Sequence, residues 1–309
     1  MDLGNQTHIK LVLLLGFQAL HNFSILFFIL IAILFSLTVT GNAMIVTLVS
    51  WSSSLHHPMF FFLKQLSVSD IMLTIAIVPN LLHGILKGQI TMSFTACIVQ
   101  FHFFSTAIAS ECLLLAVMSY DRYLAICEPL RYISIMHTAF RTWLVLICWF
   151  SGFIATLVVV LLINRLKFCG PNTINHFFCD FTPILELSCS DVSALKLGQM
   201  LLSAPLTMIP AIFITATYIC IFITILRIPS MSGRQKAFST CSSHLAVVGM
   251  FYGSLIALYV VPSGGNLFSA DKVLSLLYTA FIPLFNPIIY SLRNQEIRRA
   301  WIKLISTRN

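Results

Sequence analysis

Charged side chains are scarce in this sequence. Asp, Glu, Lys and Arg make up 9% of its 309 residues, hydrophobic residues make up 58%, and the mean hydropathy is +0.94. A soluble globular domain carries about 25% charged residues. This chain has too little charge to cover a folded domain in water, so we expect lipid to surround most of it.

Sequence motifs of several soluble functions are also missing. No block of Lys and Arg with interleaved aromatic residues occurs, which argues against nucleic-acid binding despite the formal net charge of +8. No Cys-x-x-Cys pair indicates a zinc site, and no nucleophile–base pair, HExxH motif or phosphate-binding loop lies in the polar segments. We therefore expect no enzymatic activity. No internal repeat is visible, which argues against a transporter built from duplicated halves.

The sequence does contain seven apolar runs that are long enough to cross a bilayer, which takes about 20 residues. They span 25–49, 59–83, 95–120, 142–163, 198–226, 238–261 and 272–292. Backbone polar groups must be satisfied internally in lipid, and segments of alternating hydrophobicity are absent, so we predict helices. The predicted fold class is an all-α membrane protein, a seven-transmembrane helix bundle that forms one domain over 1–309.

The short segments between the runs carry Lys and Arg unequally. With the N-terminus outside, 12 basic residues lie on the inner side and 6 on the outer side. The inner residues are Lys64, Arg122, Arg131, Arg141, Arg227, Arg234, Lys236, Arg293, Arg298, Arg299, Lys303 and Arg308, and the outer ones are Lys10, Lys87, Arg165, Lys167, Lys196 and Lys272. Since cytoplasmic segments carry the basic excess, we expect 1–24 to be extracellular and 293–309 cytoplasmic. The expected localisation is the plasma membrane, as a multi-pass protein.

Four of the nine cysteines lie at the edges of the runs or between them, on the outer side: Cys97, Cys169, Cys179 and Cys189. They indicate two disulfides in an oxidising compartment, and the sequence alone allows three pairings. Asn5 begins an Asn-x-Thr sequon, so we expect glycosylation there. The first ten residues lack the order of a cleaved signal peptide, so we expect the first run to direct insertion.

The last segment, 293–309, predicts a short amphipathic C-terminal helix. Ile297, Ala300, Trp301 and Leu304 share one helical face, and Arg298, Arg299, Lys303 and Arg308 surround it. Such a basic helix is expected to lie on membrane lipid at the inner surface. The alternative interpretation is a frayed, solvated tail.

Four motifs narrow the possibilities within seven-helix proteins. They are LHHPMFFFLKQLSVSD (55–70), MSYDRYLAICEPLRY (118–132), KAFSTCSSHL (236–245) and PLFNPIIYSLRN (283–294). In this order they resemble the motifs of olfactory (odorant) receptors, which are rhodopsin-like G-protein-coupled receptors, and KAFSTCSSHL is the most discriminating. The modest length of the segment between the sixth and seventh runs resembles the tetrapod class II type.

The resemblance implies a function and a set of switch residues. The implied receptor binds a small, mostly apolar volatile odorant and activates a stimulatory, olfactory-type heterotrimeric G protein, which raises cyclic AMP. The implied G-protein coupling and activation residues are Asp121, Arg122, Tyr123, Tyr218, Asn286, Pro287 and Tyr290. The sequence departs from the family pattern at Ser119, where Ala is more usual, at Thr217, where Ser is usual, and at Glu128, where His is frequent.

Asp121 and Arg122 are adjacent charges directly after the third apolar run, where Glu111 is the one charged residue between 96 and 117. At the membrane boundary Asp121 can hold the Arg122 guanidinium while both remain near water. The resemblance implies that a bistable bundle releases Arg122 to bind a Gα subunit. The alternative interpretation is a basic anchor of the positive-inside type.

Asp70 and Glu111 are the carboxylates expected inside the membrane. Glu111 lies eleven residues before Arg122, about three helical turns. In the family pattern Asp70 faces the bundle centre near Asn42 and Asn286. Two acids with polar neighbours predict a possible sodium site, because hard cations take oxygen ligands. A proton shared between the two acids explains the pair equally well. We expect no other cofactor.

The resemblance places a ligand pocket between the third, fifth and sixth helices. The candidate lining residues are His102, Phe104, Ser105, Ile108, Ala109, Cys112, Ser203, Leu206, Thr207, Phe251, Tyr252, Leu255, Tyr259 and Thr279. Most are apolar or aromatic, which suits a small volatile anchored by one hydrogen bond. Phe104 occupies the position at which amine receptors carry Asp, so a cationic amine ligand is not expected.

The family pattern also selects one disulfide pairing, Cys97–Cys179 with Cys169–Cys189, which pins the outer segment above the pocket. His176, Cys179 and Asp180 together have residue types that bind copper or zinc. A disulfide-bonded Cys179 cannot be a thiolate ligand, so a structural role is favoured for this group.

Two other functions stay open on the sequence. A receptor of the same fold could detect a non-volatile metabolite outside the nose. A channel or transporter would need polar residues along several helices, and only Asp70 and Glu111 are deep.

Overall fold

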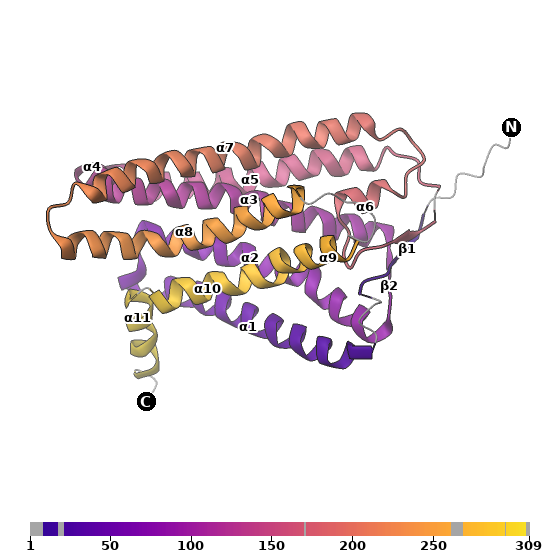
Figure 1. The fold of residues 1–309 in the computed structure, drawn as a ribbon, viewed down its shortest axis with the longest axis horizontal. Coiled ribbons are helices and arrows are strands. Elements are labelled where there is room, and N and C mark those ends of the chain that lie inside the picture. Colours follow the sequence, from indigo (N-terminus) through magenta and orange to yellow (C-terminus); the bar gives the residue numbers. More distant parts are fainter. Residues whose placement is uncertain (1–8, 18–21, 170, 261–267, 294, 307–309) are drawn as a thin grey trace.

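The computed structural model describes residues 9–17, 22–169, 171–260, 268–293 and 295–306, which include the seven predicted spans (Figure 1). The sequon residue Asn5 and the side chain of Tyr259 lie outside the described part. Six spans are single helices: α1 (Ser24–Trp51), α2 (Pro58–Lys87), α3 (Phe94–Cys127), α5 (Thr138–Ile163), α7 (Ser193–Leu226) and α8 (Met231–Val260). The seventh consists of α9 (Phe268–Leu276), the π-helical turn η4 (Leu277–Phe281) and α10 (Ile282–Arg293).

These spans are long and apolar enough to cross a membrane, which confirms the predicted seven-helix bundle. Several helices extend beyond the apolar runs. α3 continues to Cys127 and α8 begins at Met231, seven residues outside the predicted bounds 120 and 238. Helical hydrogen bonding does not require apolar side chains, so a helix can continue past the hydrocarbon core into the headgroup region.

Local sequence explains where α2 and α3 begin and end. α2 has Pro58 in its first turn, where the missing N–H costs no helical bond, and it ends at Gly88 in the left-handed conformation (φ 77°). Ser93 caps α3 by accepting a hydrogen bond from the Ala96 N–H at 3.1 Å. A sharp stop after α2 and a capped start of α3 keep the connection between them short.

α3 is the central helix and packs against α2, α5 and α7. Gly152 on α5 lets that helix approach α3 closely, because a Cβ there would lie 2.9 Å from Ser110 Oγ. Gly41 on α1 has the same function against α10, where a Cβ would lie 3.3 Å from Pro287 Cγ. Gly41 therefore allows the close approach of the first and seventh spans.

A small sheet covers one end of the bundle, which we call the sheet end. Its strands are β1 (Leu11–Leu14), β2 (Ile90–Ser93) and β3 (Thr173–Ile174), in the order β2-β1-β3. β1 is antiparallel to β2, with Leu11 opposite Ser93, and parallel to β3. This sheet could not be predicted from the sequence, because such short strands have no periodicity of their own and pair across distant segments. The short helix α6 (Phe181–Leu185) lies at the same end.

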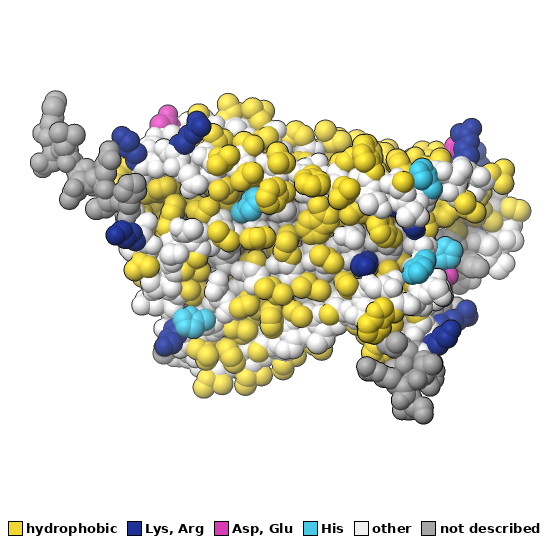
Figure 2. Space-filling model, turned by 180° about the vertical axis from the view of Figure 1, so that it is seen from behind, with side chains coloured by type: hydrophobic (Ala, Val, Ile, Leu, Met, Phe, Trp, Pro, Cys, Tyr) yellow, Lys and Arg dark blue, Asp and Glu magenta, His cyan; other side chains and the backbone are white. Residues whose placement is uncertain are grey.

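The opposite end, which we call the α11 end, carries the short helices η2 (Ser53–Leu55) and α4 (Pro129–Ile135) and the terminal helix α11 (Gln295–Ser306). The predicted amphipathic helix is thus present. Its apolar face packs on the bundle, since Ile297 and Ala300 are buried, while Trp301 is 40% exposed. Figure 2 shows basic side chains toward the two ends of the molecule and a mostly hydrophobic surface between them.

Candidate functional site

The Asp121–Arg122 pair is closed at the α11 end of α3. Arg122 donates from Nε to Asp121 Oδ2 at 3.1 Å and from Nη2 to the same oxygen at 2.5 Å. The other carboxylate oxygen, Oδ1, accepts a hydrogen bond from the Tyr132 hydroxyl at 2.9 Å. Asp121 is fully buried, and the Arg122 side chain is 13% exposed. Both charges are therefore neutralised within α3 and α4.

Tyr132 was not predicted as a site residue, although it ends the second quoted motif. It lies on α4, outside the seven spans, and only the folded structure brings its hydroxyl to Asp121. Burial raises the pKa of Tyr132, and the Asp121 carboxylate adds to this increase. The hydroxyl therefore remains protonated and acts as the donor.

Tyr218 on α7 is bound to α8. Its hydroxyl lies 2.6 Å from Nδ1 of His244, and the two rings stack with centroids 5.7 Å apart. His244 is fully buried and belongs to KAFSTCSSHL, which the sequence analysis used only to identify the family. The predicted switch residue Tyr218 thus faces α8 in this conformation.

Two hydrogen bonds join α3 to α7 near the same end. Thr217 Oγ1 donates to Ser119 Oγ at 3.2 Å, and Cys127 Sγ lies 3.2 Å from Thr224 Oγ1. Tyr123 packs beside a small apolar cluster that contains Ile221, Ile225 and Cys241. α3 and α7 are therefore linked by direct side-chain contacts near the Asp121–Arg122 pair.

Asn286 and Pro287 connect α10 to α2 and α1. Asn286 Nδ2 lies 3.0 Å from each carboxylate oxygen of Asp70. Pro287 has no N–H, so the carbonyl of Pro283 one turn earlier lacks its helical partner. Asn42 supplies a replacement by donating from Nδ2 to that carbonyl at 2.9 Å. Asn42 therefore binds the α10 backbone.

Tyr290, the last residue of the Asn-Pro-x-x-Tyr element, is buried at the end of α10. Its hydroxyl has no hydrogen-bond partner among the described residues. Buried hydroxyls normally have one. The hydroxyl is therefore available to form a new contact in another conformation of the bundle.

Asp70 and Glu111 are neighbours in the bundle core, and both are almost completely buried. Glu111 Oε1 and the Oδ1 of Asn286, which contacts Asp70, are buried without a hydrogen-bond partner among the described residues, as is Asn42 Oδ1 on α1. Hard oxygen donors without partners fit a small hard cation such as sodium, or ordered water. The donor set is thus chemically suited to the predicted ion.

The candidate ligand residues do not all share one face. Phe104, Cys112 and Phe251 are buried in the main core, with Ile108, Tyr252 and Leu255 packed against it. Ser203, Leu206 and Thr207 are half-buried on α7, as is Ser105 on α3. Thr279 is fully buried and donates to the Ser275 carbonyl at 2.7 Å.

His102 and Ala109 differ from the prediction, because they lie against α5. His102 Nδ1 is 3.0 Å from Thr156 Oγ1, and its ring contacts Phe153. The Ala109 Cβ lies in the close α3–α5 contact at Gly152. The two residues are seven apart, about two turns, so they share one helical face, and both contact α5.

The segment before Cys179 covers the buried end of α3. Phe178 contacts Phe104 edge-on with ring centroids 5.0 Å apart, and Tyr278 lies on the other side of Phe104 at 6.1 Å. Phe177 stacks on Phe17 at 5.3 Å. Phe178 and Tyr278 were not predicted, and their apolar side chains gave no signal that separates a pocket wall from the core.

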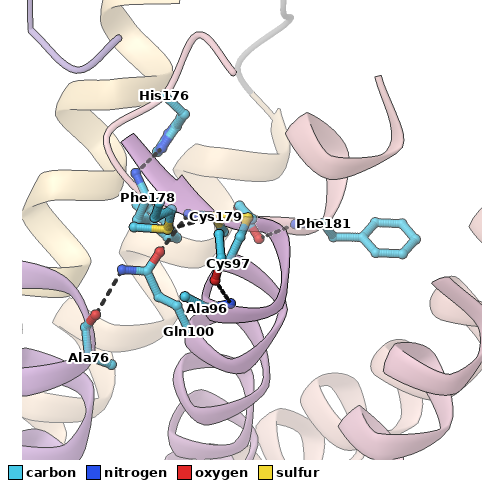
Figure 3. Close-up of a disulfide and its surroundings, with 11 residues drawn as sticks. Ala76, Ala96, Cys97, Gln100, His176, Phe178, Cys179 and Phe181 are labelled. Atoms are coloured by element: carbon cyan, nitrogen blue, oxygen red, sulfur yellow. Dashed lines mark hydrogen bonds between the residues drawn. A yellow bond between two sulfur atoms is a disulfide. The ribbon is translucent and has the colours of Figure 1, made fainter. Parts of the chain in front are cut away.

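The structure contains both disulfides that the family resemblance implied, Cys97–Cys179 and Cys169–Cys189. Beside the Cys97–Cys179 disulfide, the Gln100 side chain makes two hydrogen bonds, which Figure 3 shows. Its amide nitrogen donates to the Ala76 carbonyl at 2.8 Å, and its oxygen accepts from the Cys179 N–H at 2.9 Å. The covering segment is therefore fixed to both α2 and α3.

His176 and Asp180 have structural roles beside this disulfide. Burial, with Lys272 nearby, lowers the pKa of His176 to about 3, so its ring is neutral and accepts from the Phe178 N–H at 3.4 Å. Asp180 accepts from the Phe181 N–H at 2.7 Å, and burial raises its pKa. The described residues contain no cluster of three His, Cys, Asp or Glu side chains that could hold a metal ion.

Lys272 binds the covering segment to the first residues of the described chain. Its ammonium donates to the Gly16 carbonyl at 2.7 Å and to Asn175 Oδ1 at 2.8 Å. The sheet end is thus held by the sheet, the Cys97–Cys179 disulfide and one lysine.

Seven spans, a closed Asp–Arg pair and an Asn-Pro-x-x-Tyr element together define a G-protein-coupled receptor of the rhodopsin-like class. A sequence model described as olfactory receptor matches residues 29–308. The chain belongs to the olfactory receptor family. Its relatives are receptors and not enzymes, and the chain is a multi-pass membrane protein that senses odorants.

Curated relatives match over nearly their whole length. Human olfactory receptor 11L1 is 44% identical over 305 residues, which cover 99% of this chain and 95% of the relative. Human olfactory receptor 6P1 is 42% identical over 301 residues, covering 97% and 95%. Rat olfactory receptor 1500 is 42% identical over 305 residues, covering 99% and 98%.

Proposed function

We propose that this receptor binds a small, mostly apolar volatile odorant between α3, α7, α8 and η4, and that it activates a stimulatory, olfactory-type G protein. The result is a rise in cyclic AMP. The observation that carries the proposal is the closed Asp121–Arg122 pair, which Tyr132 holds at the end where α3, α7 and α8 meet.

The proposed ligand residues come from α3, α7, α8 and η4. They are Phe104, Ser105, Ile108, Cys112, Ser203, Leu206, Thr207, Phe251, Tyr252, Leu255 and Thr279, with Tyr259 carried over from the sequence. Apolar and aromatic walls with a few hydroxyls favour a ligand held by apolar contact and one hydrogen bond. Phe178 closes the proposed pocket by its contact with Phe104.

The proposed mechanism is a population shift, in which the odorant binds the active bundle more tightly than the inactive one. Moving α8 away from α7 breaks the Tyr218–His244 hydrogen bond. Tyr218 and Tyr290 are then free to approach Arg122, and the Tyr290 hydroxyl has no competing partner among the described residues. Arg122 leaves Asp121 and contacts the Gα subunit.

The proposed topology has the sheet end outside and the α11 end in the cytoplasm of a cell with the receptor in its plasma membrane. The basic excess supports this orientation, as do the two disulfides at the sheet end. Glycosylation at Asn5 is part of the same proposal. Sodium held by Asp70 and Glu111, with amide oxygens nearby, is the proposed allosteric ion.

Cyclic AMP measured in cells tests the function. The chain is expressed with a trafficking chaperone, surface levels are measured, and a broad panel of volatiles is applied. We expect a concentration-dependent rise that Arg122→Ala abolishes and that Arg131→Ala, which removes an exposed arginine of α4, retains. A response only to non-volatile metabolites would show that the ligand is not a volatile odorant and would favour the alternative ligand class. An Arg122→Ala variant that signals at the wild-type level would overturn the proposed switch.

A further inference from the structure

A pocket of about 220 Å³ lies at the α11 end, between the ends of α1, α2 and α5. It is lined by Val49, Ser50, Leu55, His56, Phe61, Lys64 and Arg141. None of these residues belongs to the proposed switch or to the odorant site. The lining combines three apolar walls with two permanent positive charges and contains no carboxylate.

Arg141 is held rigidly at one side of this pocket. Its Nη1 donates to the His56 carbonyl at 3.0 Å, and its Nη2 donates to Thr138 Oγ1 at 3.1 Å. The guanidinium carbon lies 5.3 Å from the centre of the Phe61 ring. Its Nε is buried and has no hydrogen-bond partner among the described residues. A guanidinium held in place by two hydrogen bonds is pre-organised for an anionic oxygen ligand.

Lys64 adds a second charge from α2. Neither ion pair found among the described residues involves Lys64 or Arg141, since one joins Arg122 to Asp121 and the other joins Arg131 to Glu128. Two cations that share a pocket repel one another, and an anion between them removes that repulsion. The electrostatics of the pocket therefore favour a ligand with at least one negative charge.

The surroundings indicate that the anion is part of a lipid. Trp51, which ends α1 beside Ser50, is 74% exposed, and Trp143, two residues after Arg141, is 58% exposed. Indole side chains at the ends of spans are typical of the bilayer interface, and the outward surfaces of α1 and α5 are apolar. A ligand in this pocket can thus place a phosphate between the cations and its acyl chains along α1 and α5.

We propose that this pocket binds the phosphate-bearing headgroup of an anionic phospholipid, with Lys64 and Arg141 as its cationic contacts. The assignment to the cytoplasmic leaflet, which carries the anionic lipids, rests on the orientation given under the proposed function. The lipid bridges α2 and α5 at the end where the receptor meets its G protein. Binding of the lipid headgroup depends on the pocket alone and not on the orientation of the receptor in the membrane.

Native mass spectrometry of the full chain in detergent tests the proposal, with phosphatidylinositol 4,5-bisphosphate as the probe and phosphatidylcholine as the neutral comparison. Lys64→Gln is the first variant, because Lys64 makes no hydrogen bond or ion pair with the described residues. We expect it to raise the lipid Kd about fivefold, and Lys64→Gln combined with Arg141→Gln to raise it about thirtyfold. Phosphatidylcholine is expected to show no difference between variants.

A matched control removes two charges elsewhere at the same end, by Arg131→Gln with Arg227→Gln. It is expected to change the Kd less than twofold. An equal loss in this control would mean a diffuse charge effect and overturn the site. If inositol trisphosphate binds as tightly as the lipid, the ligand of the pocket is a free phosphate compound, and the lipid assignment is overturned. Unchanged binding in Lys64→Gln and in the double pocket variant would overturn the whole proposal.

The failure of this proposal is separable from that of the receptor orientation. An antibody against a tag after Asn309 is applied to intact cells and to permeabilised cells. Staining without permeabilisation would overturn the proposed topology, whereas the detergent measurement reads the pocket alone.

Discussion

Thr217 on α7 donates a hydrogen bond to Ser119 on α3, with 3.2 Å between the two oxygens. Both are positions at which the sequence departs from the usual family residues. Each departure alone carried no meaning in the sequence, but in the structure the two side chains are partners. The hydrogen bond joins α3 to α7 two residues before Asp121, so it stabilises the helix packing in which the Asp121–Arg122 pair is closed.

Ser119→Ala is expected to raise basal cyclic AMP. A buried hydrogen bond between helices stabilises the conformation that contains it by about 1 kcal/mol, so its loss shifts the population toward other conformations about fivefold. Basal cyclic AMP per receptor at the cell surface measures the shift. Thr215→Ala, which removes an exposed hydroxyl from α7, the helix of the partner Thr217, is the control and is expected to leave the basal level unchanged. A decrease in Ser119→Ala would show that the bond belongs to the active conformation.

Tyr132→Phe is expected to raise basal cyclic AMP further. The variant keeps the ring and removes the donor that holds Asp121 Oδ1 at 2.9 Å. Hydrogen bonds to charged groups contribute about 1.5 kcal/mol or more, and Asp121 then keeps Arg122 as its one side-chain partner among the described residues. The ratio of basal to odorant-stimulated signal is the measurement. An unchanged ratio, at equal surface expression, would remove Tyr132 from the switch.

Because His176 is buried in its neutral form, we expect the stability of the folded receptor to depend on pH. Its pKa is about 3 in the folded receptor and about 6.5 in an unfolded chain, so between these values the unfolded state binds the extra proton. Stability is therefore complete above about pH 6.5 and falls as the pH decreases toward 3. At pH 5 the loss is about 2 kcal/mol from this residue.

The thermal unfolding midpoint of the detergent-solubilised receptor, measured from pH 7.5 to pH 5, tests this expectation. The midpoint should fall with pH in the wild type and fall less in His176→Gln. His57→Gln, which replaces an exposed histidine, should keep the wild-type slope. If His176→Gln keeps that slope as well, the acid sensitivity resides in other groups.

The sequence predicted the parts of the fold that depend on hydropathy, and the family resemblance predicted the parts that depend on motifs. Apolar runs are local, so the seven spans were predictable, and so was the terminal helix that carries Trp301. The pairing of Leu11–Leu14 with 90–93 and 173–174 was not, because it depends on contacts between distant short segments. A strand of four residues is too short for its hydrophobic pattern to identify it as a strand.

The site was predicted less completely, for a geometric reason. Counting back along α3 from Arg122 gives depth, but depth does not show which helix a side chain meets. His102 and Ala109 lie at suitable depth and yet contact α5, because Gly152 allows that helix to approach. Tyr132 and His244 acquire their roles from partners on other elements. Asp121 and Tyr218 were predicted as switch residues, but their pairing with Tyr132 and His244 is not recognisable before the helices are packed.

Glu111→Gln is expected to abolish a stabilising effect of sodium. The donor set of Asp70, Glu111 and nearby amide oxygens fits a hard cation, and ligands that bind only the folded state raise the unfolding midpoint. The wild-type midpoint should therefore rise as sodium chloride replaces choline chloride at constant ionic strength. Glu111→Gln keeps the shape of the side chain and removes the charge, so its midpoint should not respond.

Potassium chloride distinguishes the ion from a general salt effect, since a larger cation should stabilise the wild type less. A proton shared by Asp70 and Glu111 is the competing explanation, and it predicts no response to sodium in either protein. It also predicts that Glu111→Gln, which leaves a single acid to ionise beside Asn286, is as stable as the wild type at every sodium concentration. A sodium response that survives in Glu111→Gln would place the ion elsewhere in the receptor.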